Sequence, residues 1–228
     1  MKIRAAHILI DTESERESAS IRSMNGISEY GIDYVQYITT QYTNDVWKYQ
    51  RPYDEWINHK SAHFGLYRSA QTVIYDYFTN DLDAFMIFEA DCMRCGDISL
   101  EHFIDKVHQA VRFSIKHNTF LFSFGDRYFE TVLQSPILKR DDEYNDFVIT
   151  DKIIGCHCIL MIKQNRELLL KELLHSNWDG LDMWFNSAFY ANRYKYNLTL
   201  GINDNPITYQ YEAESMIDGV VKKTQRMT

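Results

Sequence analysis

An apolar run that ends in two carboxylates constrains the fold of this chain more than any other stretch. Residues Ala84–Phe88 read Ala-Phe-Met-Ile-Phe, and Glu89-Ala90-Asp91 follows directly. An apolar run of this length, bounded by polar residues, predicts a buried strand in a parallel or mixed sheet. Side chains alternate along a strand, so Glu89 and Asp91 are expected on the same side of its carboxyl end.

Two carboxylates this close repel each other unless a cation lies between them. Carboxylate oxygens are ligands for hard divalent ions such as Mn²⁺ or Mg²⁺, which also bridge to the phosphates of a substrate. In open α/β sheets, ligands bind at the edge formed by the carboxyl ends of the strands. The stretch therefore predicts a metal site at Glu89 and Asp91. A strand that simply runs into an acidic loop is the alternative.

The rest of the chain predicts a single α/β domain, because 45% of its 228 residues are hydrophobic and no linker or repeat interrupts it. Strand-like and helix-like stretches alternate, which favours parallel pairing through βαβ units. The predicted strands span 2–10, 32–39, 84–91, 120–124 and 149–162, with short pieces in 196–217, and the predicted helices span 14–24, 61–78, 99–111, 167–174 and 181–194. The charged residues 139–146 are expected to form an exposed loop.

Charge and hydropathy limit the partners and the location. A net charge of −8 argues against a general nucleic-acid or anionic-membrane surface, which would favour a basic face. No apolar run approaches the ~20 residues that span a bilayer, and the N-terminal residues lack the apolar segment of a signal peptide. The expectation is a cytoplasmic protein without a transmembrane segment.

The four cysteines leave an alternative open. Cys92 and Cys95 have the C-x-x-C spacing of a zinc knuckle, and Cys156 and Cys158 could supply the other half. The second pair is C-x-C and lies between strand-like apolar residues, so reduced thiols are the default. A zinc-stabilised interaction domain is therefore one alternative function. A metal-dependent hydrolase is another, although no H-x-H, H-x-D or H-E-x-x-H pattern occurs.

Several stretches together resemble the lipopolysaccharide and procollagen galactosyltransferase group of GT-A glycosyltransferases. The stretches are Ile8–Arg16, Gly65–Ala70, Glu89–Asp91, Gly155–Ile162 and Pro206–Ile217. Gly65–Ala70 matches the family pattern G-x-x-x-S-H except that Ala70 replaces the His. Glu89–Asp91 stands in the place of the Asp-x-Asp element, and Pro206–Ile217 matches the closing P-x-x-x-Q-x-x-x-x-S-x-I segment. The resemblance implies a single Rossmann-like GT-A domain, with a mostly parallel central sheet flanked by helices.

The resemblance also implies a function. A glycosyltransferase of this kind moves a hexosyl or pentosyl group from a nucleoside-diphosphate sugar to an acceptor hydroxyl, here with inversion. Residues 1–98 would be the donor-binding half and residues 99–228 the acceptor-binding half. The residues that the resemblance places at the donor are Asp11, Thr12, Arg16, Thr40 and Arg68, and those at the Mn²⁺ or Mg²⁺ ion are Glu89, Asp91 and His157. The alternatives are that Arg16 faces solvent and that His157 is a structural residue of its strand. The acceptor stays open among a glycan, a lipid-linked group, a protein and a modified nucleobase.

An inverting transfer needs a carboxylate that takes the proton of the acceptor hydroxyl. Asp179 and Asp182 lie at the start of a late predicted helix, beside Trp178 and Trp184, whose rings could stack on sugars. Asp182 is the predicted base. The structural alternative is that Asp179 caps the helix and that the helix dipole stabilises Asp182 in the first turn. Asp179 and Asp126 are the next candidates for the base.

Overall fold

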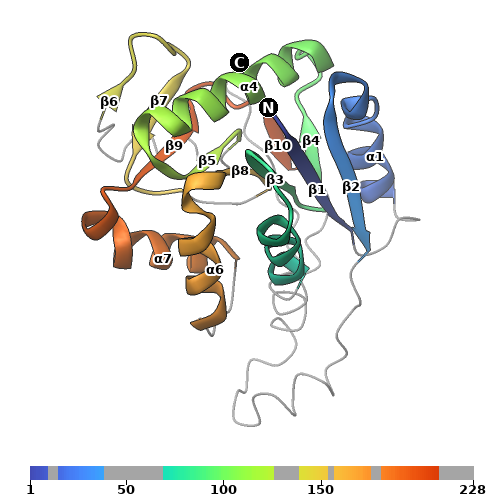
Figure 1. Ribbon diagram of the computed structural model, residues 1–228. Coiled ribbons are helices and arrows are strands. Elements are labelled where there is room, and N and C mark those ends of the chain that lie inside the picture. The colour runs from blue at the N-terminus through green and yellow to red at the C-terminus, as the bar shows by residue number, and fades with distance from the viewer. Residues whose placement is uncertain (10–14, 39–68, 126–138, 154–156, 176–180, 211–228) are drawn as a thin grey trace, which may run out of the picture.

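The computed structural model describes residues 1–9, 15–38, 69–125, 139–153, 157–175 and 181–210, and Figure 1 shows their arrangement. The strands are β1 (Ile3–Leu9), β2 (Ile32–Ile38), β3 (Ala84–Phe88), β4 (Cys92–Arg94), β5 (Thr119–Ser123), β6 (Lys139–Arg140), β7 (Phe147–Thr150), β8 (Cys158–Ile162), β9 (Thr199–Asn203) and β10 (Thr208–Gln210). The helices are α1 (Glu15–Ser23), α4 (Leu100–His117), α6 (Arg166–His175) and α7 (Leu181–Tyr196), with short 3-10 turns η1 (Ile27–Tyr30) and η2 (Lys163–Asn165) and a further helical stretch at 69–79.

Eight of these strands form one sheet in the order β2-β1-β3-β8-β5-β9-β7-β6, and β10 pairs with β4 in a second, two-stranded sheet. In the large sheet, β1 pairs in parallel with both β2 and β3, and β5 pairs in parallel with β9. Strands β8 and β7 run against their neighbours. Six strands thus share one direction, and the predicted α/β class with a mostly parallel sheet and flanking helices is confirmed.

The central strands of the sheet are buried on both faces by two separate apolar cores. In β3, Phe85 and Ile87 belong to one core, whereas Ala84, Met86 and Phe88 belong to the other. The first core contains side chains of the helical stretch 69–79 and of α7, and the second contains those of α4. Because helices cover both faces, all five β3 side chains are buried, which explains the unbroken apolar run in the sequence.

Helix α4 begins where its sequence predicts. The Ser99 side chain accepts a hydrogen bond from the His102 backbone N–H at 3.1 Å, which satisfies one of the amides that a helix start leaves unpaired. The apolar face then buries Phe103, Val107 and Val111 at 0% exposure. The predicted cap and the predicted apolar face are both confirmed.

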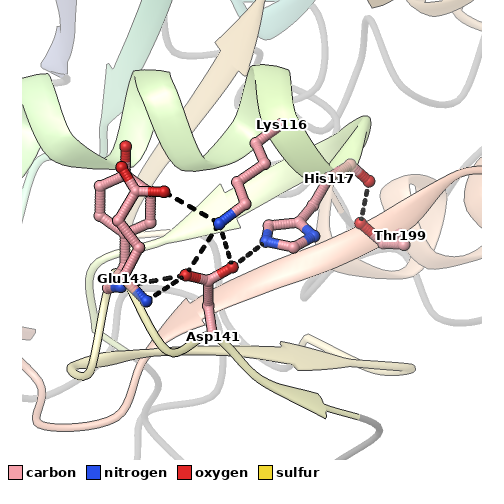
Figure 2. A network of polar contacts seen from close by, with 6 residues as sticks. Lys116, His117, Asp141, Glu143 and Thr199 are labelled. Atoms are coloured by element: carbon pink, nitrogen blue, oxygen red, sulfur yellow. Dashed lines mark hydrogen bonds and ion pairs between the residues drawn. The ribbon is translucent and has the colours of Figure 1, made fainter.

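The predicted exposed loop at 139–146 is wrong in part. Lys139 and Arg140 are exposed, but they pair with β7, and Asp141 is only 4% exposed. Figure 2 shows the reason: Lys116 and His117, from the end of α4, both bind the Asp141 carboxylate. The charge pattern was compatible with solvent exposure, but the two cationic partners of Asp141, Lys116 and His117, lie more than twenty residues away along the chain.

The predicted strand at 149–162 is also wrong in part, because it is two strands, β7 and β8, at separate places in the sheet. The polar residues Asp151 and Lys152 interrupt the apolar run. A local turn forms there, in which Thr150 Oγ1 lies 3.4 Å from the Lys152 N–H and 3.2 Å from its carbonyl. Over the described ranges, the structure contains no helix that combines the length and the apolar character needed to cross a membrane.

Candidate active site

The candidate site lies at the edge of the large sheet where β1, β3 and β5 end. The antiparallel strand β8 begins at this edge, since Cys158 is opposite Phe88 in β3 and Ile159 is opposite Ser123 in β5. Carboxyl ends of parallel strands are where open α/β sheets bind ligands. The residues just after β3 and β5, and just before β8, are therefore the ones brought together.

The two predicted carboxylates lie on a tight turn rather than on the strand itself. Strand β3 ends at Phe88, and the Cys92 N–H donates to the Glu89 carbonyl at 3.0 Å, which closes a β-turn over residues 89–92. Glu89 and Asp91 are both partly buried. The expectation that they share one face of an extended strand is wrong, because the strand has ended before Glu89. We call residues 89–92 the carboxylate turn.

Two strands from later in the chain hold the carboxylate turn. The Glu89 N–H donates to the His157 carbonyl at 2.9 Å, which fixes the turn to the residue that precedes β8. Strand β10 places Gln210 opposite Cys92, and the Gln210 side-chain amide lies 3.5 Å from the Glu89 carboxylate. Gln210, from the closing segment of the family resemblance, thus lies beside a predicted metal ligand.

Gly125 allows β10 and His157 to approach the end of β5. A Cβ atom on Gly125 would lie 2.2 Å from the Thr208 carbonyl oxygen and 2.6 Å from His157 Nε2. His157 itself is 1% exposed. Its carbonyl accepts from the Glu89 N–H of the carboxylate turn, and its ring lies close to Gly125. Within the described ranges, no three or more His, Cys, Asp and Glu side chains form a group that could hold a metal ion.

Arg16 is the one predicted donor-binding residue that falls within the described ranges. It lies in the first turn of α1, and its Nη2 is 3.7 Å from the carboxylate of Glu17, which is buried. Asp11, Thr12, Thr40 and Arg68 lie outside the described residues. Their proposed contacts with the nucleoside and the phosphates stay predictions.

Asp182 lies in the first turn of α7, which begins at Leu181, as the sequence predicts. Its side chain lies outside what the structure describes, as do Asp179 and Asp126. Trp184, predicted to stack on a sugar, is 1% exposed and packs against Phe185 in the apolar core. A buried ring cannot offer a face to a sugar in this arrangement, so the stacking prediction for Trp184 is wrong.

Three of the four cysteines are described, and all three are buried free thiols: Cys92, Cys95 and Cys158. Burial, and then the hydrogen bond with Cys158, raise the pKa of the Cys92 thiol well above its usual value. Cys95 instead donates to the Pro206 carbonyl at 3.5 Å. Cys156 lies outside the described residues, so the zinc alternative stays a prediction.

One residue near the site was missed in the sequence. His7, in β1, is 0% exposed and hydrogen-bonds the backbone of the carboxylate turn. Burial lowers the pKa of His7 to about 4, so its imidazole is neutral at physiological pH. The available signal was a polar ring in the middle of the apolar stretch Ala5–Leu9, where a buried group needs hydrogen-bond partners.

Comparison with known proteins gives likenesses of fold only. No protein-family model matches the sequence, and no curated protein matches it. Among solved structures, the chain is similar to a glycosyltransferase involved in the glycosylation of the major capsid of PBCV-1, with 8% identity, a TM-score of 0.46, and coverage of 87% of this chain and 76% of that chain.

Two further likenesses are of the same order. UDP-glucose pyrophosphorylase complexed with UDP-glucose has 9% identity and a TM-score of 0.46, over 89% of this chain and 90% of that chain. A mutant of Drosophila beta-1,4-galactosyltransferase 7, in complex with manganese, UDP-Gal and xylobiose, has 10% identity and a TM-score of 0.42. The match covers 92% of this chain and 71% of that chain. Likenesses of this size assign neither an activity nor a ligand to this chain.

Proposed function

We propose that this protein is a metal-dependent glycosyltransferase that moves a sugar from a nucleoside-diphosphate sugar to an acceptor hydroxyl with inversion. The observation that carries the proposal is the carboxylate turn. It presents Glu89 and Asp91 within three residues at the edge where β1, β3 and β5 end. Acidic side chains at this edge suit a ligand that brings a divalent cation and phosphates.

The donor atoms at the carboxylate turn fit Mn²⁺ or Mg²⁺ in their chemistry. Both ions prefer oxygen ligands, and Mg²⁺ is commonly held by one or two carboxylates together with substrate phosphates. The proposed ligands are Glu89 and Asp91. His157, the third predicted ligand, does not form a group of three with them in the described residues that could hold an ion. When bound, such an ion stabilises the negative charge that develops on the departing diphosphate.

The remaining roles follow the two halves of the chain. In the donor half, 1–98, Asp11, Thr12 and Thr40 would bind the nucleoside, and Arg16 and Arg68 the phosphates. In the acceptor half, 99–228, Asp182 would take the proton of the acceptor hydroxyl, which makes that oxygen the nucleophile. We also assign the protein to the cytoplasm, because a reducing compartment keeps thiols such as Cys92 and Cys158 unpaired.

The test is metal-linked binding of nucleoside diphosphates. UDP, GDP, CDP and ADP are titrated into the protein by calorimetry, with Mn²⁺ and then with a chelator. At least one should bind much more tightly with Mn²⁺, and Asp91→Asn should lose most of that gain. Asp97→Asn, an exposed acid six residues further on, is the matched control and should keep the gain. Equal affinities with and without Mn²⁺ for all four nucleotides would contradict the proposal.

A further inference from the structure

We infer that His7, acting through Ser20, is a positioning residue that locks the carboxylate turn. The inference deepens the proposed function and rests on it, since it concerns the turn that carries the proposed metal ligands. His7 lies opposite Phe88 in the pairing of β1 with β3, so its ring is next to the point where β3 ends. The rings of His7 and Phe88 pack edge to face at 5.8 Å.

The imidazole of His7 contacts three polar groups from three different elements. Nδ1 lies 2.6 Å from the hydroxyl of Tyr34 in β2. Nε2 lies 3.2 Å from the Glu89 carbonyl and 3.0 Å from Ser20 Oγ in α1. The Ser20 hydroxyl donates onward to the Cys92 carbonyl at 2.5 Å. One buried ring therefore reaches the first residue of the turn directly and the last residue through Ser20.

The direction of each hydrogen bond follows from the groups involved. A carbonyl oxygen only accepts, so the single proton of the Ser20 hydroxyl goes to the Cys92 carbonyl. Ser20 Oγ must then accept from His7, which places the imidazole proton on Nε2, where it is shared with the Glu89 carbonyl. The remaining nitrogen, Nδ1, accepts the proton of the Tyr34 hydroxyl. A neutral imidazole, with one N–H donor and one acceptor nitrogen, can therefore make all of these hydrogen bonds.

A neutral donor at this place has a clear advantage for a cation site. It fixes the backbone of Glu89 and Cys92 without adding a positive charge next to the carboxylates. A lysine or arginine would instead pair with them and repel an incoming cation. Ser20 belongs to α1, the helix that carries Arg16, and Ser23 of the same helix accepts from the Arg94 N–H at 2.7 Å. The network thus ties α1 to both ends of the carboxylate turn.

The experiment compares His7→Leu with His7→Gln. Leucine fills much of the ring's volume and removes the donor, whereas the amide NH₂ of glutamine can occupy the place of Nε2. Ser20→Ala is the second variant and removes one hydroxyl with almost no change of volume. Tyr34→Phe removes the hydroxyl that donates to His7 Nδ1, and Tyr77→Phe is its matched control. The Tyr77 hydroxyl is also buried, it has no hydrogen-bond partner within the described ranges, and its ring stacks on Phe85 in the other core.

The first measurement is amide hydrogen exchange at Glu89 and Cys92, whose N–H groups make the two backbone bonds of the turn. His7→Leu and Ser20→Ala should raise these exchange rates about tenfold, the order expected for one lost buried hydrogen bond. Tyr34→Phe should raise them as well. His7→Gln and Tyr77→Phe should stay near the unmodified protein. Unchanged exchange in both His7→Leu and Ser20→Ala, or equal losses in His7→Leu and His7→Gln, would overturn the inference.

The second measurement is the gain in UDP, GDP, CDP or ADP affinity that Mn²⁺ gives. This gain should fall about tenfold in His7→Leu and Ser20→Ala and recover in His7→Gln, while affinity without metal stays constant. If folded Ser20→Ala keeps the full increase in nucleotide affinity that Mn²⁺ gives, the positioning role is overturned. If the unmodified protein shows no gain, the proposed function fails by itself. The exchange rates then still decide whether His7 locks the turn.

Discussion

At the scale of single residues, Gly125 shows how closely the chain segments approach at the candidate site. A Cβ atom there would lie 2.2 Å from a backbone oxygen of Thr208, and a backbone oxygen cannot turn away as a side chain can. Gly125→Ala should therefore displace β10 or the end of β5, with a loss of stability of about 1–3 kcal/mol, as is usual for overpacking. Urea denaturation followed by circular dichroism measures the loss.

Gly96 provides the control for Gly125. A Cβ atom on Gly96 would meet nothing within 4 Å, so Gly96→Ala should change the stability little. Equal stabilities of Gly125→Ala and the unmodified protein would show that β10 does not pack against the end of β5 as described.

Asp182 is the residue on which the chemical step of the proposed transfer depends. Asp182→Asn keeps the shape and removes the proton acceptor, so turnover should fall by ~10²-fold or more, the usual scale of general-base catalysis. Affinity for the donor should change little, because the base acts only when the acceptor hydroxyl attacks. Steady-state kinetics and donor titrations separate the two effects.

Asp179→Asn is the matched control for Asp182→Asn, since Asn caps a helix about as well as Asp. It should leave turnover nearly unchanged. Normal transfer by Asp182→Asn would instead move the search for the base to Asp179 and Asp126, or point to a retaining mechanism.

At the scale of elements, Asp141 joins the end of α4 to the turn between β6 and β7 (Figure 2). Its carboxylate accepts from Lys116 Nζ at 2.9 Å, from His117 Nε2 at 2.5 Å, and from the backbone N–H groups of Glu143 and Tyr144. Asp141→Asn should cost roughly 2–3 kcal/mol at pH 7, because it removes one partner of a buried charged network. Chemical denaturation measures the cost.

The same contacts predict how stability depends on pH. Burial acts to raise the pKa of the Asp141 carboxyl, but the hydrogen bonds from Lys116, His117 and the two backbone amides outweigh it, so the pKa lies well below its usual value. A carboxyl with a lowered pKa in the folded state stabilises the fold above its unfolded pKa of about 3.9. That contribution is lost as the pH falls below about 4. Asp141→Asn should therefore lose less stability than the unmodified protein between pH 5 and pH 3.

Glu143→Gln is the control within the same network. Glu143 also binds Lys116, at 3.0 Å, but its side chain is 62% exposed. An exposed ion pair contributes little, so this change should cost less than about 1 kcal/mol. A larger cost for Glu143→Gln than for Asp141→Asn would contradict the importance given to burial.

At the scale of the whole molecule, a ligand that binds the folded protein must raise its melting temperature. At a concentration of 100 times its Kd, a nucleoside diphosphate with Mn²⁺ should add about 2.7 kcal/mol. For a chain of 228 residues this corresponds to a shift of roughly 5–10 °C. Thermal denaturation with UDP, GDP, CDP or ADP measures the shift. A chelator should remove it, and an equal shift without metal would count against the carboxylate turn as a metal site.

Much of the fold could be predicted because it depends on local patterns. The apolar run of β3 indicates burial on both faces, and Ser99 with the apolar spacing after it indicates the start of α4. Each of these features is encoded within one short stretch, where side-chain periodicity and the hydrogen-bonding needs of the backbone act directly. The sequence by itself thus determined the α/β class, the direction of most strands and the place of the two acidic residues along the chain.

The geometry of the candidate site was decided only by the tertiary structure. Strand β8 enters antiparallel between β3 and β5, and β10 returns to β4, which brings Gln210 to Glu89 across 121 positions of sequence. His7 reaches Glu89 in the same way, across 82 positions. Pairing order and register are set by the packing of both faces of the sheet at once. No local pattern specifies which distant backbone will meet a buried imidazole or an unsubstituted glycine.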